Sequence, residues 1–417
     1  MRRRSDRGPQ PRRLARVSDV LLVLNCGSSS IKFALFDAGS PVVPRLPLWR
    51  GAVDGIGTGQ PRYRDGDWTD AVALSDAPGA YHAALAFIRE RVVARLGASR
   101  LVAVAHRVVH GGSRYFSPVR VDADVLADLT SYVPLAPLHQ PFALEAIGTL
   151  LQAQPRLAQV ACFDTAFHRT MPLVEKILPL SWSAWQDGLR RYGFHGLSYE
   201  YVAGALAERH GDRARGRTIV AHLGSGASLC AMRDLSSVAT TMGFSSLDGL
   251  MMGTRCGALD PGAILYLMQT RQLGLDDVSR VLYHESGLLG VSGVSSDPRE
   301  LLGQESRDDE TGARVRAALD LYVRRIVREI GALTAVLGGL DVLAFTAGVG
   351  EHNPEIRRRI CSDLTYLGLA VDDVANAANH TTISPAGAPV TVAVEPTNEE
   401  WMAATHATAL LRDASQS

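Results

Sequence analysis

Lysine is almost absent from this chain of 417 residues, since only Lys32 and Lys176 stand among 43 basic residues. The formal net charge is zero at pH 7, so no broad basic field favours nucleic acid or an acidic membrane surface. No apolar run approaches the ~20 residues of a membrane span. With 46% hydrophobic and 21% charged residues, the composition predicts a soluble cytoplasmic protein that binds neither nucleic acid nor membranes.

Cysteine is also scarce, and its spacing is unlike that of a metal site or a disulfide framework. The cysteines are odd in number and lie in apolar or loop contexts without a metal-type pair: Cys26, Cys162, Cys230, Cys256 and Cys361. We therefore expect reduced thiols in a cytosolic compartment.

An arginine-rich head precedes the first apolar segment. Seven arginines lie within residues 1–17, among Gly8, Pro9 and Pro11, and no apolar core follows that would make a secretory signal. A disordered extension is favoured over a transit peptide or a nucleic-acid arm. The remaining length is too great for one ordinary core and predicts two domains.

A small-residue loop near the N-terminus is the most informative segment. Residues 25–32 read Asn-Cys-Gly-Ser-Ser-Ser-Ile-Lys and join an apolar run at 20–24 to an alternating one. The pattern predicts a strand, a tight turn and a second strand, with backbone N–H groups, serine hydroxyls and the Lys32 ammonium around one small volume. A phosphate chain suits such a volume, and turn chemistry alone is the alternative. The glycine spacing is not that of a Walker loop.

A second unit of the same kind lies about half a chain away. Residues 218–223 are largely apolar, and they lead through Gly-Ser-Gly-Ala-Ser at 224–228 into another apolar run at 229–232. A third glycine turn, Gly348 to Glu351, follows a predicted strand at 341–347. Two such units predict a duplicated fold with an ATP site between two lobes.

Predicted strands and helices alternate along the chain, which is typical of α/β proteins. Apolar residues recur at helical spacing over 81–96 and 314–337, and Gly338-Gly339 ends the second helix. Short apolar strands are expected at 101–105 and 159–163. Polar residues just past such strand ends mark the edge where these sheets bind ligands.

Two arginines stand in settings where a cation needs an anionic partner. Arg107 follows the predicted strand at 101–105, and Arg255 lies in an apolar, glycine-rich stretch. Each arginine alone is read as a structural ion pair. Together, and beside phosphate loops, they also suit phosphoryl transfer, which depends on positioning and charge neutralisation.

Histidines near strand ends leave similar alternatives. His139, His168, His195 and His222 are each typical of hydrogen-bonded structural histidines, and a donor to a transferring phosphoryl group is the alternative. No pair has the ligand spacing of a zinc site. Asp164 ends a predicted strand and suits an arginine, a Mg²⁺ water or a proton.

The C-terminus contains a helix-start signal. Thr397-Asn398-Glu399-Glu400 predicts a capping box that opens a final helix to about Leu411. Glu399 is then read as a first-turn glutamate that favours the helix dipole.

These segments together resemble the acetate kinase family. The resemblance runs in order from about residue 20 to 412, and only the arginine-rich head lies outside it. It rests on residues 24–32, 106–112 (His-Arg-Val-Val-His-Gly-Gly), 163–168 (Phe-Asp-Thr-Ala-Phe-His), 192–196 (Tyr-Gly-Phe-His-Gly), 251–255 (Met-Met-Gly-Thr-Arg) and 396–400 (Pro-Thr-Asn-Glu-Glu).

The resemblance implies the fold of the acetate and sugar kinase, heat-shock 70 and actin superfamily. That fold is an α/β duplication of two ribonuclease-H-like lobes around a central nucleotide cleft. The N-terminal lobe would span 18–166, joined by the C-terminal helix at 396–413, and the nucleotide-binding lobe would span 167–395. The implied activity is reversible phosphoryl transfer between ATP and acetate, giving acetyl phosphate on the way to acetyl-CoA, with Mg²⁺ or Mn²⁺ and in a homodimer.

The site residues of the family fall by position on named residues of this sequence. Asn25 and Glu399 would hold the metal, Arg107 would bind the carboxylate, and the methyl pocket would be lined by Val109, Leu138 and Phe194. Asp164 matches the catalytic aspartate, and His195 and Arg255 match transition-state stabilisers. The nucleotide would be bound by Lys32, His222, Leu223, Gly224, Ser225, Gly226, Asp297, Pro298, Arg299, Gly348, Val349, Gly350, Glu351 and His352.

The implied chemistry is direct in-line transfer. A carboxylate nucleophile is already ionised at pH 7, so no strong base is needed. The barrier lies in bringing two anions together, which Arg107, Arg255, His195 and Mg²⁺ would lower. We therefore expect Asp164 to organise Arg107 or Mg²⁺ waters rather than to act as an essential base.

Several positions depart from the family pattern. Ser225 replaces an asparagine in the second loop, so we expect weaker or water-bridged phosphate contacts. Ser246 replaces a proline of the methyl pocket, which predicts a roomier pocket and a weaker preference for acetate over propionate. The other departures are Gln140, Cys256, Ala258 and His352.

Three functions stay open on the sequence. The first is a short-chain acyl kinase that prefers acetate, and the second is one that prefers propionate or butyrate, although butyrate kinases are shorter. The third is a nucleotide-driven scaffold of the actin and heat-shock type, or a paralogue that binds nucleotide without turnover. A scaffold would not need Arg107, Asp164, His195 and Arg255 together.

Overall fold

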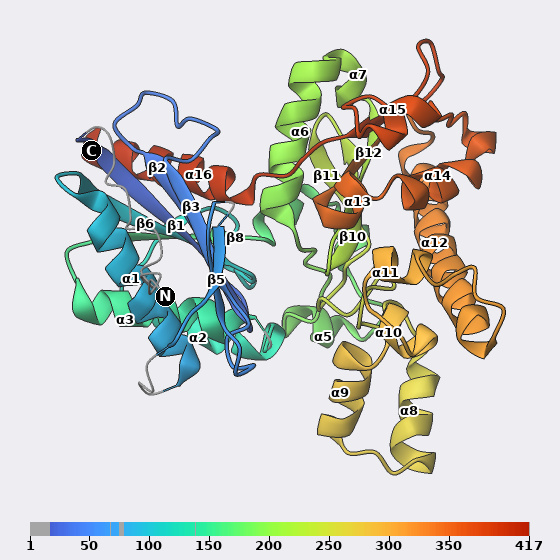
Figure 1. Ribbon diagram of the computed structural model, residues 1–417, viewed down its shortest axis with the longest axis horizontal. Coiled ribbons are helices and arrows are strands. Elements are labelled where there is room, and N and C mark those ends of the chain that lie inside the picture. The colour runs from blue at the N-terminus through green and yellow to red at the C-terminus, as the bar shows by residue number, and fades with distance from the viewer. Residues whose placement is uncertain (1–16, 67, 75–78, 138, 417) are drawn as a thin grey trace, which may run out of the picture. The chain divides into compact units, whose positions relative to one another are not determined.

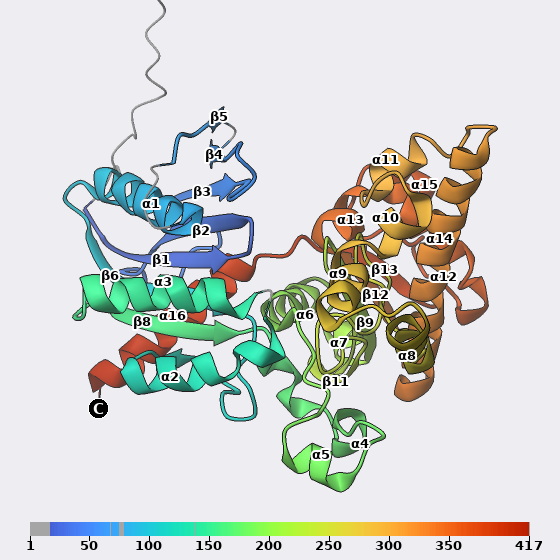
Figure 2. The same ribbon diagram turned by 90° about the horizontal axis from the view of Figure 1, so that it is seen from below.

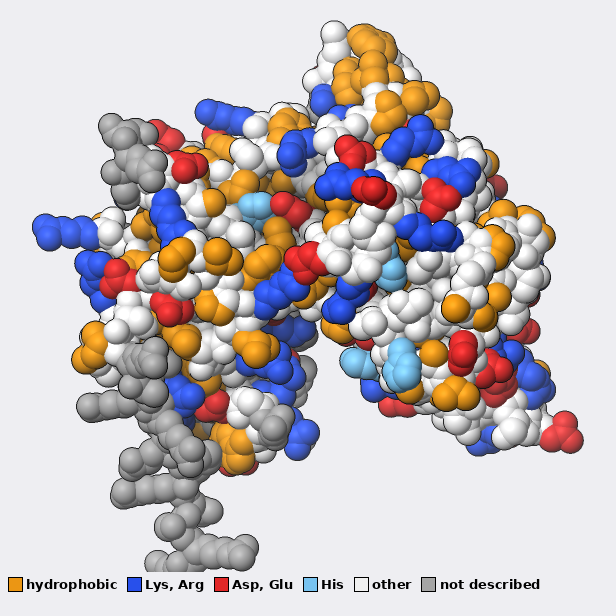
Figure 3. Space-filling view, turned by 90° about the horizontal axis from the view of Figure 1, so that it is seen from above, with side chains coloured by type: hydrophobic (Ala, Val, Ile, Leu, Met, Phe, Trp, Pro, Cys, Tyr) orange, Lys and Arg blue, Asp and Glu red, His pale blue; other side chains and the backbone are white. Residues whose placement is uncertain are grey.

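The computed structural model describes residues 17–66, 68–74, 79–137 and 139–416. Their contacts divide the chain into two units: unit 1 ends at Phe163 and resumes at Asn398, and unit 2 is Asp164–Thr397. The predicted arginine-rich extension lies outside the described residues apart from its last member, Val17. Basic and acidic side chains are interspersed over the face drawn in Figure 3, in keeping with a formal net charge of zero.

Unit 1 is built on one mixed sheet whose strand order is β5-β4-β3-β2-β1-β6-β8-β7 (Figure 1). Strands β1, β2 and β3 form an antiparallel meander, and β6 and β8 continue the sheet in parallel with β1. The strands are β1 (Asp19–Cys26), β2 (Ser30–Asp37), β3 (Trp49–Asp54), β4 (Arg62–Asp65), β5 (Trp68–Ala71), β6 (Arg100–Val108), β7 (Val119–Arg120) and β8 (Ala158–Phe163). The helices are α1 (Ala80–Leu96), α2 (Ala123–Ser131), α3 (Gln140–Ala153) and α16 (Glu399–Gln416), with a 3-10 turn at Val133–Leu135.

Successive side chains of β8 point to opposite faces of this sheet, so their contacts show which helix covers which face. The Sγ of Cys162 lies 3.8 Å from the carbonyl oxygen of Ala403 in α16, whereas Nε2 of Gln159 donates to the carbonyl oxygen of Ile147 in α3. Figures 1 and 2 accordingly show α16 and α3 on opposite faces. Arg107 is the register partner of Cys162, so its side chain stands on the α16 face.

Unit 2 repeats this topology in a second sheet with the order β11-β10-β9-β12-β13. Strands β9, β10 and β11 form the antiparallel meander, and β12 and β13 continue the sheet in parallel with β9. The predicted duplication is therefore confirmed in strand order and direction. The strands are β9 (Arg217–Leu223), β10 (Ala227–Arg233), β11 (Ser236–Thr240), β12 (Val342–Thr346) and β13 (Thr391–Val394).

Helices cover both faces of the second sheet. Val220 and Cys230 share a buried cluster with Tyr199 of α6, while Nη2 of Arg233 donates to the carbonyl oxygen of Leu337, the last residue of α12. Figure 1 shows α6 and α12 on the two sides of the sheet. The helices are α4 (Leu173–Lys176), α5 (Trp182–Gln186), α6 (Gly196–His210), α7 (Asp212–Arg215), α8 (Pro261–Thr270), α9 (Leu275–His284), α10 (Gly287–Ser292), α11 (Pro298–Leu302), α12 (Glu310–Leu337), α13 (Ala347–His352), α14 (Pro354–Ser362) and α15 (Asp373–Ala377), with 3-10 turns at Ala166–Thr170 and Thr365–Leu367.

The long helix α12 forms where the apolar spacing predicts it. Asp309 caps its N-terminus by accepting the N–H of Gly312 at 2.9 Å, and Gly338 ends it in the left-handed region at φ 72°. The apolar positions at three- and four-residue spacing are all buried: Val315, Leu319, Val323, Ile326, Ile330, Leu333 and Leu337. In the described part of the chain, no helix is both long and apolar enough to cross a membrane.

Two predicted elements near the site differ in the structure. Strand β6 continues through Arg107 because its parallel pairing with β8 continues, so Arg107 lies within the strand rather than after it. The predicted glycine turn at 348–351 is the short helix α13, whose first N–H, that of Ala347, is accepted by the Glu351 carboxylate at 2.8 Å.

The cap of the final helix also differs. The N–H of Trp401 is accepted by Oδ1 of Asn398 at 3.1 Å, so Asn398 caps α16, and the helix continues past Leu411 to Gln416. The Thr397 hydroxyl does not act as the cap, because it donates to the Ser198 hydroxyl of α6 at 2.8 Å.

Candidate functional site

In unit 1, the first predicted phosphate loop is a tight hairpin between β1 and β2. The N–H of Gly27 donates to the carbonyl oxygen of Ser30 at 2.8 Å, which closes the turn. Asn25 and Lys32 are cross-strand partners, so their side chains stand on one face of the sheet. Lys32 is exposed there, which leaves its ammonium accessible to an anion.

Arg107 is held next to this hairpin by two oxygen partners. Its Nη1 donates to Oδ1 of Asn25 at 3.1 Å, and its Nε lies 3.8 Å from Oε2 of Glu399. The side chains of Arg107 and Glu399 are only 21% and 14% exposed. Glu399 is therefore an ion-pair partner of Arg107 as well as a first-turn helix residue. One guanidinium, one amide oxygen and one carboxylate are thus brought together.

The polypeptide that follows Arg107 is fixed by a buried glutamine. Oε1 of Gln140 accepts the N–H of His110 at 3.1 Å, and Nε2 of Gln140 donates to the His110 carbonyl oxygen at 3.0 Å. This pairing fixes the backbone next to Val109, which is buried and was predicted to line the methyl pocket. Leu138, predicted for the same pocket, lies outside the described residues. The Gln140 departure thus has a structural role that its sequence position did not reveal.

In unit 2, Asp164 directly follows β8 and its side chain is buried. The Asp164 carbonyl oxygen accepts the N–H of Gly196 at 2.8 Å, and a β-carbon at Gly196 would clash with that oxygen. Only glycine permits this approach. It fixes the start of α6 beside the backbone of Asp164, and His195, which directly precedes α6, takes a left-handed φ of 59°.

A structural histidine supports the predicted acetate residue Phe194. The carbonyl oxygen of Phe194 accepts from Nε2 of His168 at 2.9 Å, and Nδ1 of His168 lies 2.9 Å from the Ser237 hydroxyl. Burial lowers the pKa of His168 to about 4, so its ring is neutral near pH 7. Its hydrogen bonds are the structural kind predicted as one alternative for this residue.

The second predicted phosphate loop, Gly224–Gly226, lies against two stacked imidazoles. The rings of His195 and His222 are 4.1 Å apart and nearly parallel. A β-carbon at Gly226 would lie 3.2 Å from Nε2 of His195 and 3.6 Å from Nη1 of Arg255, and one at Gly224 would lie 3.7 Å from Nε2 of His222. Three predicted site residues therefore converge on the backbone of this loop.

Arg255 is a half-buried cation that contacts two neutral groups. Its Nη1 donates to the carbonyl oxygen of Ser246 at 3.3 Å and contacts Sδ of Met252 at 3.8 Å. Burial lowers the pKa of Arg255, but a guanidinium remains protonated near pH 7. The contact also places the Ser246 departure beside a predicted transition-state stabiliser.

The predicted nucleotide-binding segment Gly348–His352 is held in place by Arg357. This fully buried guanidinium donates from Nη1 to the carbonyl oxygens of Gly350 and Glu351 at 2.8 and 2.9 Å, and from Nε to Oδ1 of Asn376 at 2.8 Å. The Glu351 carboxylate accepts backbone N–H groups of Ala347 and Thr397. It therefore maintains the shape of α13.

The other predicted nucleotide residues of unit 2 lie nearer solvent. His352 is exposed, and its Nε2 is 3.8 Å from Oε2 of Glu351. Arg299 is also exposed and pairs with Asp297, which in turn caps α11 by accepting the N–H of Arg299 at 2.8 Å. Ser225 is exposed at the tip of the second loop.

The hydrogen-bonding roles of several side chains near the predicted site residues were missed by sequence reasoning. These side chains are Gln140, Ser198, Tyr199, Ser228 and Arg357. Strand register would have found Ser228, because it is the cross-strand partner of His222. The other residues become visible only from tertiary contacts.

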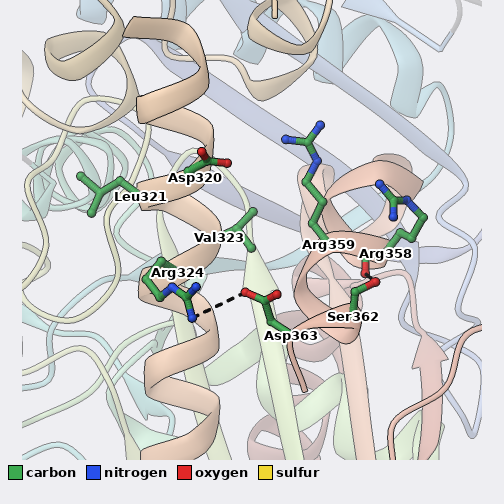
Figure 4. A pocket seen from close by; sticks show the side chains of 8 residues that line it. All are labelled: Asp320, Leu321, Val323, Arg324, Arg358, Arg359, Ser362 and Asp363. Carbon is green, nitrogen blue, oxygen red and sulfur yellow. Dashed lines mark hydrogen bonds and ion pairs between the residues drawn. The ribbon is translucent and has the colours of Figure 1, made fainter. Parts of the chain in front are cut away.

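A groove of about 570 Å³ lies between α12 and α14 in unit 2, and no predicted site residue lines it (Figure 4). Its charged side chains pair locally: Arg324 lies 3.7 Å from Asp363, Arg358 pairs with Glu355, and Arg359 pairs with Glu305. This charge balance gives no reason to place an anionic substrate in the groove.

Comparison with known proteins decides the family. A model of the acetokinase family matches residues 20–405. The chain belongs to the acetokinase family. The acetate kinase of Rhodopseudomonas palustris (strain TIE-1) is 46% identical over 397 residues, which cover 94% of this chain and 98% of that protein.

Solved structures agree with the acetokinase assignment. The acetate kinase of Porphyromonas gingivalis has a TM-score of 0.82 and 35% identity over 94% of this chain and 100% of its own. A propionate kinase from Francisella tularensis subsp. tularensis SCHU S4 has a TM-score of 0.85 and 34% identity over 93% and 98%. With the repeated strand order, these matches confirm the predicted fold, a duplicated actin-like ATPase fold of two ribonuclease-H-like lobes.

Proposed function

We propose that this acetokinase is an acetate kinase, which reversibly transfers the γ-phosphoryl group of ATP to acetate and forms acetyl phosphate and ADP. Membership in the acetokinase family over nearly the whole chain carries the proposal. The convergence of Arg255 and two imidazoles on the Gly224–Gly226 loop supports it, because phosphoryl transfer needs positioned donors and positive charge.

The acid is assigned to unit 1. Arg107 binds the acetate carboxylate, since a guanidinium fork matches a carboxylate and Arg107 is partly shielded from water. The methyl group is assigned to Val109, Leu138 and Phe194. Burial of Val109 and Phe194 supports this assignment, because an apolar wall suits a methyl group.

The nucleotide is assigned mainly to unit 2. Its phosphates bind the backbone of His222–Gly226 and the ammonium of Lys32, and its nucleoside binds Asp297–Arg299 and Gly348–His352. The clamp of Arg357 on the Gly350 and Glu351 carbonyls supports a preformed nucleoside site at α13.

The residues present fit the magnesium ion that the family implies. Mg²⁺ prefers oxygen ligands and keeps several waters, so one or two protein oxygens suffice. Asn25 Oδ1 and the Glu399 carboxylate both contact Arg107, and would hold the ion, with Mn²⁺ as a substitute. When bound, the ion would neutralise phosphate charge. Among the described residues no group of three or more His, Cys, Asp or Glu side chains forms another metal site.

The reaction is a direct displacement. A carboxylate oxygen of acetate forms a bond to the γ-phosphorus as the bond to the ADP oxygen breaks, and no proton is transferred. Arg107 and Arg255 offset the repulsion between the two anions, and Nε2 of His195 donates to the transferring group. Asp164 organises these groups as a positioning residue.

Ser246 sets the acid preference. A proline there in the family pattern fills space that serine leaves open, so we expect a weakened preference for acetate over propionate. One methylene in an apolar pocket is worth ~1–3 kcal/mol, so Ser246→Pro should raise the acetate-to-propionate ratio of kcat/KM. A higher ratio in the wild type than in Ser246→Pro would contradict this role.

We also propose a cytoplasmic homodimer. The described cysteines are all free thiols, in keeping with a reducing compartment where acetyl phosphate can feed acetyl-CoA formation. None of the residues of α8 is buried, and an apolar set on and beside it is exposed: Leu259, Leu265, Tyr266, Met268 and Leu275. Such a surface suits a second copy of the chain. Light scattering of the purified protein tests the dimer, and a monomer at micromolar concentration would contradict it.

The activity is tested by trapping acyl phosphate as the hydroxamate, with purified protein, Mg-ATP, and acetate, propionate or butyrate. We expect the fastest turnover with acetate. No turnover with any acid, alongside intact ATP binding, would instead support a nucleotide-binding scaffold.

A further inference from the structure

Two serine hydroxyls hold the inner nitrogens of the stacked histidines in unit 2. Nδ1 of His195 lies 2.8 Å from Oγ of Ser228, and Nδ1 of His222 lies 2.8 Å from Oγ of Ser198. Each serine has one further hydroxyl partner. The Tyr199 hydroxyl lies 2.5 Å from Ser228, and the Thr397 hydroxyl lies 2.8 Å from Ser198.

Local structure explains why these groups meet. Ser228 and His222 are cross-strand partners, and alternation places both on the α6 face of the sheet. His195 immediately precedes α6, and Ser198 and Tyr199 lie in its first turn. The first turn of α6 thus packs against one cross-strand pair of β9 and β10. Two series of hydrogen bonds connect the helix to this pair.

The direction of the first chain follows from counting hydroxyl protons. Tyr199 is fully buried, and burial raises its pKa well above the ordinary value, so it keeps its proton. Its hydroxyl must therefore donate to Ser228, which leaves the Ser228 proton for Nδ1 of His195. In the opposite direction, the Tyr199 proton would have no acceptor among the described residues, which is costly for a buried donor.

The second chain has the same direction. The Thr397 hydroxyl donates to Ser198, and the remaining Ser198 proton is directed to Nδ1 of His222. Both imidazoles then accept at Nδ1 and carry hydrogen at Nε2. Stacking at 4.1 Å agrees with this state, because two charged rings at that distance would repel each other.

We infer that Tyr199 and Ser228 are positioning residues that hold His195 in the Nε2–H tautomer, with this donor directed at the Gly224–Gly226 loop. Thr397 and Ser198 hold His222 in the same state. The other tautomer would present a lone pair to phosphate oxygens and repel them. The consequence for catalysis rests on the proposed function, because it assumes that a phosphoryl group is the acceptor.

The tautomer can be measured without any turnover. Long-range proton–nitrogen correlation spectra of protein labelled with ¹⁵N-histidine distinguish the two tautomers and the charged ring, and a His195→Gln variant assigns the signals. We expect Nε2–H for His195 in the wild type at pH 7.5. The Nδ1–H tautomer or an imidazolium at that pH would overturn the inference, even in an active enzyme.

Two variants test the relay, the hydrogen-bonded series from Tyr199 through Ser228 to Nδ1 of His195. Tyr199→Phe keeps the ring and removes the proton donor, and Ser228→Ala removes the partner of Nδ1. We expect both to shift His195 toward a tautomer mixture and to lower kcat roughly 10- to 100-fold with KM for ATP and acetate little changed. Ser228→Thr, which restores a hydroxyl, should recover part of the rate.

Matched controls separate positioning from general loss of structure. Ser237→Ala removes a buried hydroxyl from Nδ1 of His168, and Tyr322→Phe removes a buried phenol hydroxyl from α12. Both should leave the His195 tautomer unchanged. Unaltered tautomer and kcat in Tyr199→Phe and Ser228→Ala would overturn the positioning role. A wild type that shows the expected tautomer but phosphorylates no acid would contradict the proposed function alone.

Discussion

The two units place different chemistry at the same position of one topology. In unit 1, the hairpin between the first two strands stands beside Arg107 and Glu399, and charge dominates. In unit 2, the equivalent hairpin between β9 and β10 stands against neutral hydrogen-bonding groups, with Arg255 as the added cation. Under the proposed function, this difference would let unit 1 bind the small acid while unit 2 contributes most of the phosphate contacts.

The largest expected effect comes from removing the cations. Arg107→Gln should mainly raise KM for acetate, while Arg255→Gln should mainly lower kcat, because the proposed mechanism has Arg107 bind the acid and Arg255 stabilise the transferring group. In each variant kcat/KM should fall roughly 100- to 1,000-fold. Steady-state kinetics with both substrates measures the split.

Arg100→Gln is the matched control for Arg107. Arg100 begins the same strand, is exposed and pairs with Asp19 at the surface, so its loss should leave both kinetic constants near the wild-type values. Identical kinetic profiles for the Arg107 and Arg255 variants would remove the proposed difference between the units.

Buried histidines should make both units sensitive to acid. Burial lowers the pKa of His106, His110 and His168 to about 4 from an ordinary 6.5. Between pH 6.5 and pH 4 these histidines are protonated in the unfolded chain but remain neutral in the folded protein. The stability that comes from keeping them neutral is therefore present above pH 6.5 and is lost as the pH falls toward 4. Each such histidine should cost about 2 kcal/mol of unfolding free energy at pH 5.

Denaturant unfolding at pH 7 and pH 5 measures this loss. The neutral variant His168→Gln should lose less stability on acidification than the wild type, and His284→Gln, which changes an exposed histidine, is the control. An equal loss in the wild type and His168→Gln would show that His168 does not contribute.

A smaller effect, confined to KM for ATP, is expected from a substitution at Arg357. Arg357→Lys keeps the charge but not the planar fork, so it cannot make all the hydrogen bonds that hold α13 and α15. We expect KM for ATP to rise about tenfold, with little change in KM for acetate. Arg358→Lys is the control, because this neighbour is exposed and pairs with Glu355. Equal changes in both KM values would show that Arg357 supports more than the nucleotide site.

The smallest effect on turnover is expected at Asp164, which lies where the two units join in sequence. Asp164→Asn should keep near-normal kcat at saturating Mg²⁺ and raise the Mg²⁺ concentration needed for half-maximal rate. A complete loss of turnover with unchanged metal and acetate binding would assign Asp164 an essential proton-transfer role instead.

Sequence patterns predicted the fold better than the contacts of the site. The strand–turn–strand units, α12 and the acetokinase resemblance are confirmed because apolar periodicity and glycine turns are local signals. The predicted extent of β6 was wrong. The polar pair His106 and Arg107 looked like a strand end, but the parallel pairing with β8 continues past them.

The relay side chains could not be predicted for a related reason. Serine and tyrosine at Ser228 and Tyr199 match ordinary strand and helix positions, and only the crossing of α6 over the β9–β10 pair gives them partners. Thr397 likewise looked like a helix cap until Asn398 proved to hold that position. The assigned roles of the site residues remain predictions.

The direct attack of acetate on the γ-phosphorus is the central claim, and stereochemistry tests it most directly. ATP made chiral at the γ-phosphorus with oxygen isotopes would be converted with acetate, and the configuration of acetyl phosphate determined. We predict inversion, the result of a single in-line displacement. Retention would indicate two transfers through a phosphorylated side chain and would contradict the account.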